Sequence, residues 1–356
     1  MKRVATRALV ALGGVVLVGS GLAAPAVAVT APDAPQFGWE LLDSGSVDTL
    51  STLDAVSADV AWVGTCCVFS GGALLRTVDG GETFTDVAPL PGLDYIDIEA
   101  VDADVALVLA LGETQPSTIF RTTDGGASWT ETFRTRRVAV ACMAMFDRRH
   151  GIVVGDPVDG KFQILATADG GRSWDFVDDS GMPAALEGEF VGAFGGDCLT
   201  ATGRSAFFGT VADPPRVFRS HDRGMTWDVV STSSFPVAIT KLDFRTNKLG
   251  LAEGVGRTTD GGATWELLSG PGAPPARLGF AWWSDQRGDE RLTGVPDAQK
   301  TVFGVVSDDG SWVSVDRGKT WQQFSDEGFY NVDCAEATTA CWASGFDGRI
   351  AKLTVD

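Results

Sequence analysis

Residues Arg121–Trp129 read RTTDGGASW, and a version of this nine-residue stretch occurs six times in the chain. The other copies are RTVDGGETF (Arg76–Phe84), ATADGGRSW (Ala166–Trp174), RSHDRGMTW (Arg219–Trp227), RTTDGGATW (Arg257–Trp265) and VSVDRGKTW (Val313–Trp321). The steps between their aspartates are 45, 45, 53, 38 and 56 residues. Such steps are typical of a repeat array whose loops differ in length.

Each position of the repeat suits a tight turn between two strands. The aspartate, and the hydroxyl two residues before it, can accept hydrogen bonds from N–H groups of the turn. Glycine supplies the positive φ that such a turn needs. The Ser or Thr and the aromatic residue then begin the next strand, where the ring packs against a neighbouring sheet. We therefore interpret two sets of residues as structural: Asp79, Asp124, Asp169, Asp222, Asp260 and Asp316, and Phe84, Trp129, Trp174, Trp227, Trp265 and Trp321.

The template S/T-x-D-x-G-x-S/T-W resembles the Asp-box, or BNR, repeat. In that repeat the box forms the turn between the third and fourth strands of a β-propeller blade, at the rim of the propeller. The resemblance implies an all-β fold of four-stranded blades. It also implies that the boxes are scaffold, because ligands usually bind elsewhere on a propeller.

An apolar strand precedes each box and a short outer strand follows it, which divides the chain into blades. Six blades are predicted at residues 47–89, 93–135, 137–180, 187–232, 235–269 and 276–325. Residues 329–356 contain three strand-like runs but stop where a box would follow. Gly38–Gly45 reads GWELLDSG, and the outer strand of blade five contains the same WELL sequence. We therefore predict one seven-bladed β-propeller domain over residues 29–356, closed by the N-terminal strand, which completes the last blade.

The first 28 residues have the pattern of a secretory signal peptide. Three basic residues lie within the first seven, an apolar run follows, and Ala26–Ala28 reads AVA, a cleavage site of the A-x-A type. We expect export, a secreted or extracytoplasmic protein, and no stable membrane insertion after cleavage.

The formal net charge of −19 disfavours phosphate-rich partners. Nucleic acid and anionic lipid would be repelled by such a surface. No G-x-G-x-x-G opens a helix, and the two histidines form no zinc-spaced cluster with cysteines. We expect no cofactor, no metal site and a monomer.

Six cysteines in an exported chain favour disulfides. Cys334 and Cys341 flank AEATTA, a predicted hairpin tip, and are our candidate pair. The adjacent Cys66 and Cys67 are not expected to bridge each other. Cys142 and Cys198 lie in neighbouring repeats and are one possible pair. The sequence does not decide among the three connectivities of these four residues.

Seven such blades and a signal peptide resemble the photosystem II stability/assembly factor family and its relatives outside photosynthetic organisms. GDPVDG at Gly155–Gly160, followed by GEF at Gly188–Phe190, adds to the resemblance. Photosynthetic members of that family are assembly chaperones that bind a membrane-protein subunit and have no catalytic residues. The resemblance implies an exported, non-catalytic scaffold that binds a protein or peptide partner.

A glycoside hydrolase of the Asp-box propeller type is the alternative function. Sialidases also carry Asp boxes, but they are six-bladed propellers with an Arg-Ile-Pro signature. This chain has no Arg-Ile-Pro tripeptide. Xyloglucanase-like glycosidases use paired aspartates, and the pair to test here is Asp156 and Asp159, because their loop departs from the repeat pattern. The competing interpretation is that DPVDG simply forms a turn.

Blade three carries basic residues that contrast with the acidic chain. Arg134, Arg136 and Arg137 lead into the blade, and Arg148 and Arg149 lie at its first turn. If the two groups converge, their guanidiniums could bind an acidic partner bidentately. Alternate loops of a propeller emerge on opposite faces, so the two groups could instead be separate. Salt bridges to nearby acidic residues are the other interpretation.

Overall fold

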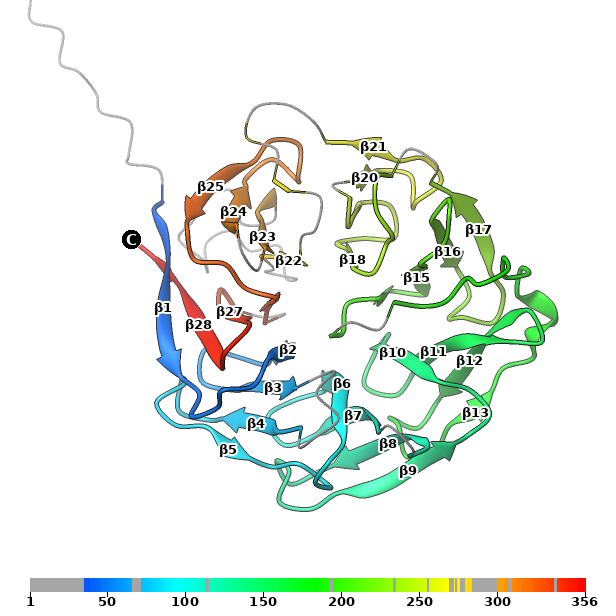
Figure 1. Ribbon diagram of the computed structural model, residues 1–356, viewed down its shortest axis with the longest axis horizontal. Coiled ribbons are helices and arrows are strands. Elements are labelled where there is room, and N and C mark those ends of the chain that lie inside the picture. Colours follow the sequence, from blue (N-terminus) through cyan, green and yellow to red (C-terminus); the bar gives the residue numbers. More distant parts are fainter. Residues whose placement is uncertain are drawn as a thin grey trace, which may run out of the picture. The chain divides into compact units, whose positions relative to one another are not determined.

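The computed structural model describes residues 35–65, 72–112, 115–192, 195–232, 235–254, 256–268, 272, 274–275, 279–283, 300–306, 309–335 and 338–356. Pro35–Asp356 form a compact unit. Within its described residues, seven four-stranded antiparallel sheets are arranged in a ring (Figure 1). This confirms the predicted all-β fold and the seven-bladed propeller.

The strands follow the blades in chain order, from the inner strand outward. Blade one contains β2 (Leu50–Ala55), β3 (Ala61–Thr65), β4 (Leu74–Thr77) and β5 (Thr85–Asp86). Blade two contains β6 (Asp94–Ala100), β7 (Ala106–Leu111), β8 (Ser117–Thr122) and β9 (Thr130–Thr135). Blade three contains β10 (Val140–Met145), β11 (Gly151–Val158), β12 (Lys161–Thr167) and β13 (Asp175–Phe176), followed by a 3-10 turn, η1 (Asp179–Gly181).

The remaining four blades repeat the same order. Blade four contains β14 (Leu199–Thr202), β15 (Ser205–Gly209), β16 (Arg216–Ser220) and β17 (Asp228–Ser231). Blade five contains β18 (Leu242–Phe244), β19 (Gly250–Ala252), β20 (Gly256–Thr258) and β21 (Glu266–Leu267). Blade six contains β22 (Gly279–Trp282), β23 (Val302–Val306), β24 (Gly310–Ser314) and β25 (Gln322–Ser325). Blade seven contains β26 (Asn331–Cys334), β27 (Cys341–Ser344), β28 (Arg349–Val355) and β1 (Phe37–Asp43).

The closure of the ring follows the prediction from the WELL sequence. β1 pairs antiparallel with β28, from Phe37 opposite Val355 to Asp43 opposite Arg349 (Figure 1). The two ends of the described unit therefore lie side by side in blade seven. The pairing covers the edge of β28, which would otherwise be open to another chain.

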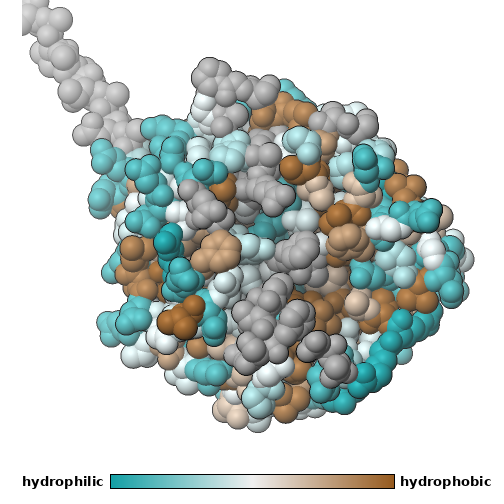
Figure 2. Space-filling view, viewed as in Figure 1, coloured by the Kyte–Doolittle hydropathy of each residue, from teal (hydrophilic) through white to brown (hydrophobic). Residues whose placement is uncertain are grey.

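Apolar cores lie between neighbouring blades, so the two inner strands of many blades are buried on both faces. β7, for example, reads ALVLAL and only its last residue is not fully buried. Between blades three and four, the ring of Phe162 lies 5.3 Å from Phe208 and 5.0 Å from Phe218. On the face seen in Figure 2, apolar residues form small groups and hydrophilic residues gather along the lower right edge.

The six repeats, which we call Asp boxes after the repeat that they resemble, are hydrogen-bonded turns between the third and fourth strands. In blade two, Thr122 Oγ1 and the Ser128 N–H donate to Asp124 Oδ1 at 2.8 and 2.9 Å, and the Gly126 N–H donates to Thr122 Oγ1 at 3.0 Å. Gly126 has a φ of 86°, as the turn requires. The other five boxes have the same contacts to the aspartate from the hydroxyl two residues before and the N–H four residues after it. The Trp129 indole donates to Val87 O of blade one at 2.7 Å.

The first position of the box has a role that the sequence did not reveal. At four boxes an arginine there donates to a backbone carbonyl of the next blade. The bonds run from Arg76 to Ala103 O (2.7 Å), Arg121 to Gly170 O (2.8 Å), Arg219 to Gly261 O (3.3 Å) and Arg257 to Arg317 O (2.8 Å). Where the ring closes, Lys352 of blade seven donates to Gly80 O of blade one at 3.4 Å. These cations therefore link consecutive blades near the rim.

Two disulfides are present among the described residues. Cys334 and Cys341 are bonded across the β26–β27 hairpin, where the two residues are directly paired. Cys142 is bonded to Cys198, which joins the inner strand of blade three to the start of blade four. Such bonds persist in oxidising environments, which fits an extracytoplasmic protein. Cys66 and Cys67 lie outside the described residues.

The predicted signal peptide also lies outside the described residues. In the part of the chain that the structure describes, no helix has the length and apolar character of a membrane span.

Candidate functional site

The two arginine groups of blade three lie at opposite ends of β10. Arg134 is in β9, before β10 begins at Val140, and Arg148 follows the end of β10 at Met145. A strand of this length separates its two ends by about 20 Å. The five arginines therefore do not form one patch. The two groups are separate, which is one of the two arrangements that the sequence allowed.

The group before β10 is engaged locally. Arg134 forms an ion pair with Glu131 of its own strand. The Arg137 guanidinium lies over the Phe176 ring, 4.8 Å from its centroid. Arg136 lies between them and is exposed. Local pairing of this kind favours a solvated, structural role for this group.

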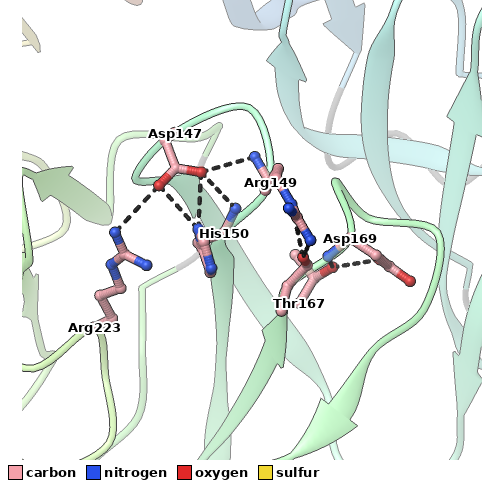
Figure 3. Close-up of polar contacts among 7 residues, drawn as sticks. Asp147, Arg149, His150, Thr167, Asp169 and Arg223 are labelled. Carbon is pink, nitrogen blue, oxygen red and sulfur yellow. Dashed lines mark hydrogen bonds and ion pairs between the residues drawn. The ribbon is translucent and has the colours of Figure 1, made fainter.

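Asp147 organises the turn after β10 (Figure 3). Its Oδ1 accepts the backbone N–H groups of Arg149 and His150 at 2.8 and 2.9 Å, and the His150 ring Nδ1 lies 2.9 Å from both carboxylate oxygens. From blade four, Arg223 Nη2 lies 3.3 Å from Asp147 Oδ2. Desolvation is the largest single effect and opposes ionisation, but the hydrogen bonds from Arg149 and His150 and the charge of His150 together outweigh it and lower the pKa of Asp147 to about 2. Asp147 therefore stays ionised and fixes the turn.

Arg148 and Arg149 project from this turn beside the Asp box of blade three. Arg148 Nη2 lies 2.9 Å from Asp102 Oδ2, although its side chain is 72% exposed. Arg149 donates to Ala168 O through Nε and Nη2 at 3.4 and 3.3 Å, which are long bonds (Figure 3). The Gly170 N–H donates to Arg149 O at 2.8 Å, which holds the turn against the box.

Neighbouring boxes add two arginines that the sequence analysis did not include. Arg172, in the box of blade three, is exposed, and its guanidinium donates to Asp169 O. Arg223 is in the box of blade four. We call Arg148, Arg149, Arg172 and Arg223 the box-end arginine cluster. Its paired side-chain carboxylates are Asp102 and Asp147.

The candidate aspartates of the GDPVDG segment have separate structural contacts. Asp156 Oδ1 accepts the Val191 N–H at 3.0 Å, and its own N–H donates to Ala139 O at 2.9 Å. Burial raises the pKa of Asp156 against that first hydrogen bond. Asp159 is exposed at the tip of the β11–β12 hairpin, where it has a φ of 53°. The contacts favour a loop anchor for Asp156 and a turn former for Asp159.

A series of carboxylates on the inner strands of neighbouring blades was not identified from the sequence. Each accepts a backbone N–H of the next blade's inner strand, which joins the blades around the central axis. The bonds run from Ala55 N to Asp333 Oδ2 (2.7 Å), Ala100 N to Asp54 Oδ2 (2.6 Å) and Met143 N to Asp97 Oδ2 (2.5 Å). The available signal was a carboxylate near the end of a strand, as in LDA for Asp54 and VDC for Asp333, or in the middle of one, as in DYIDIEA for Asp97.

These carboxylates line two central cavities of about 250 and 420 Å³. Desolvation raises the pKa of Asp97 to about 8, against the hydrogen bond from Met143 and with a contribution from the charge of Asp197. Desolvation likewise raises the pKa of Asp243 to about 7. Raised pKa values often mark functional sites. Both oxygens of Asp97 accept backbone N–H groups, however, which accounts for its position structurally. No group of three acidic, His or Cys side chains within the described ranges is arranged to hold a metal ion.

Comparison with known proteins supports the fold. No protein-family model matches the chain, and no curated protein matches it. A structure of YCF48 bound to a D1 peptide is similar, with a TM-score of 0.63 and 16% identity over 89% of this chain and 97% of that one. YCF48 from Cyanidioschyzon merolae has a TM-score of 0.61 and 15% identity over 88% of this chain and 98% of that one.

An ancestral GH74 enzyme is also similar, with a TM-score of 0.60 and 12% identity over 88% of this chain and 46% of that one. At these identities the likeness shows the fold alone. The fold thus defines the chain as a seven-bladed β-propeller.

Proposed function

We propose that this protein is an exported, non-catalytic propeller scaffold that binds an acidic segment of a partner protein through the box-end arginine cluster. The observation that carries the proposal is the gathering of four guanidiniums at one end of blades three and four in a chain with a net charge of −19. The similar YCF48 structure contains a bound D1 peptide, which supports peptide binding as the use of such a scaffold.

The cluster has donors to offer a carboxylate. Arg148 is mostly exposed, and Arg149 makes only long bonds to a carbonyl. A planar guanidinium binds a carboxylate through two parallel N–H bonds, which are stronger than its contacts to a neutral carbonyl. The ionised Asp147 holds the backbone from which these side chains project, so little backbone conformational entropy is lost when a partner binds.

Binding of a labelled peptide with four glutamates in a Gly/Ser background tests the proposal. The mature protein should bind it, and Arg148→Glu/Arg149→Glu should weaken binding at least tenfold. Arg136→Glu/Arg137→Glu, at the other end of β10, is the matched control and should change the affinity less than twofold. Fluorescence anisotropy at low and high salt measures these effects, and binding should weaken with salt. Equal affinity of all three proteins would exclude the cluster as the site.

Hydrolysis of a polysaccharide is the alternative function. It is favoured by one observation, the raised pKa of the half-buried Asp156. A panel of polysaccharides should remain intact after incubation with the mature protein. Hydrolysis that is lost in both Asp156→Asn and Asp159→Asn would replace the scaffold proposal with a glycosidase.

A further inference from the structure

We infer that a pocket at the other end of the ring binds a segment of a partner protein in which an apolar side chain lies beside a cation. The pocket has a volume of about 550 Å³ and lies between blades four to seven. Cavities of about 300–1,000 Å³ are the usual size of ligand sites. We call it the strand-start pocket, because Lys241, Gly279 and Tyr330 line it at or just before the start of inner strands. In the box-end arginine cluster, in contrast, Arg148 and Arg149 follow the end of the inner strand β10.

Two exposed phenylalanines from different blades line the strand-start pocket. Phe190, near blade four, is 39% exposed, and Phe346, in blade seven, is 43% exposed. Both are held by ordered backbone. Phe190 exchanges two backbone hydrogen bonds with Val211, and the Phe346 ring packs edge-on against Tyr330 with centroids 5.8 Å apart. Rings fixed in solvent at a pocket entrance give apolar contact with little loss of conformational entropy on binding.

Apolar side chains form much of the pocket wall. They include Val237, Val305 and Phe329. An aliphatic or aromatic side chain of a partner would therefore be removed from water here, which favours its binding.

The positive charge in the pocket is already engaged by the protein. Lys241 Nζ donates to Tyr330 O at 2.7 Å and to Asn331 Oδ1 at 3.3 Å, and it lies 3.8 Å from Asp197 Oδ2. An ammonium group has three donors. Two of them are used by Tyr330 O and Asn331 Oδ1, and the Asp197 carboxylate at 3.8 Å is an ion-pair partner, so the positive charge of Lys241 is already compensated within the protein.

The Glu253 carboxylate, which is the negative charge in the pocket, has one oxygen that accepts no hydrogen bond from the described residues. Glu253 is only 8% exposed, and its Oε2 accepts the backbone N–H and the hydroxyl of Thr240. Its other oxygen, Oε1, takes no hydrogen bond from any residue that the structure describes. An ammonium or guanidinium from a partner could donate a charge-assisted hydrogen bond to this oxygen.

Charge complementarity therefore selects the occupant. The net charge of −19 attracts cationic segments. The Tyr330 ring already has Lys241 Nζ over its face, 4.5 Å from its centroid, so Glu253 is the group that remains for a cation of the partner. An acidic segment would be repelled by the Glu253 carboxylate. The strand-start pocket and the box-end arginine cluster thus have opposite charge preferences, and this inference does not depend on the proposed function.

The test uses a fluorescein-labelled Gly-Leu-Lys-Leu-Gly amide and two matched peptides, in which norleucine or glutamate replaces the lysine. Fluorescence anisotropy should show saturable binding of the lysine peptide by the mature protein. Glu253→Gln should weaken that binding at least fivefold and leave the norleucine peptide unchanged. Phe346→Ser, at an exposed ring, should weaken both. Arg149→Glu, at the other end of the ring, is the control and should weaken neither.

Three results would overturn the inference. The first is no saturable binding of the lysine peptide up to about 1 mM, which corresponds to about −4 kcal/mol. The second is binding that Glu253→Gln and Phe346→Ser, with wild-type melting temperatures, leave unchanged. The third is equal affinity for the glutamate peptide.

Discussion

Removal of the Trp39 side chain tests how the ring is closed. β1 is the outer strand of blade seven, and Trp39 connects it to blade six. The Trp39 indole donates to Ser311 Oγ at 2.9 Å, and its ring lies 5.2 Å from Phe329 and 5.8 Å from Phe324. Trp39→Ala should therefore loosen the closing strand and destabilise the whole ring.

The expected loss can be worked from these contacts. Truncation of a fully buried Trp to Ala reduces the free energy of unfolding by about 3–5 kcal/mol. Trp39 is only half-buried, but it also loses a hydrogen bond, so we expect a loss of about 2–4 kcal/mol. Ser311 is left with a partner, because it also donates to Glu327 O at 2.6 Å. Leu41→Ala in the same strand is the control: this side chain is 54% exposed, and its loss should change stability by less than about 0.5 kcal/mol.

Guanidinium chloride unfolding, followed by circular dichroism, measures both variants against the mature protein. Midpoints should be compared at equal slope, because a changed slope would report a different unfolded state. A Trp39→Ala midpoint equal to that of the mature protein would refute the closure reasoning. An equal loss in Leu41→Ala would refute the assignment of the effect to the contact with blade six.

Two further predictions concern the contacts between blades. Arg121→Met removes the hydrogen bond to Gly170 O and should lower the free energy of unfolding by about 1–2 kcal/mol in the same assay. An unchanged free energy of unfolding would show that this link between blades is dispensable. Asp97 and Asp243 bind their protons more tightly in the folded chain than in the unfolded chain, because their pKa values rise from 3.8 to about 8 and about 7. Their stabilising contribution is therefore full below about pH 4 and is lost as the pH rises to about 8. Unfolding at pH 5 and pH 8 should show this loss, and Asp97→Asn should reduce it; the same pH dependence in the variant would contradict the assignment.

Local contacts explain why the repeat could be read from the sequence. Every aspartate in a box bonds to residues two to four positions away, as Asp124 does to Thr122 and Ser128. A turn closed over so short a stretch is encoded by adjacent residues and does not depend on the rest of the chain. The count of boxes, together with the shared WELL sequence of the closing strand, then fixed the number of blades.

The cysteines mark the limit of this local reasoning. Cys334 and Cys341 flank one hairpin tip, so a short turn places them together. Cys142 and Cys198 are 56 residues apart and meet because blades three and four pack side by side in the ring. The sequence allowed that pair but could not choose it, because the choice depends on packing between repeats.

The candidate sites depended most on the tertiary structure. Arg137 and Arg148 are close in the sequence, but the single strand between them places them at opposite ends of the ring. The same geometry brings Arg223 of the next blade to Asp147. The sequence supplied the apolar strands that precede the boxes, because a run of apolar residues is a local feature of the chain. Strand direction and the packing of blade against blade decide which residues of different blades lie at the same end of the ring. Only the folded chain contains that information.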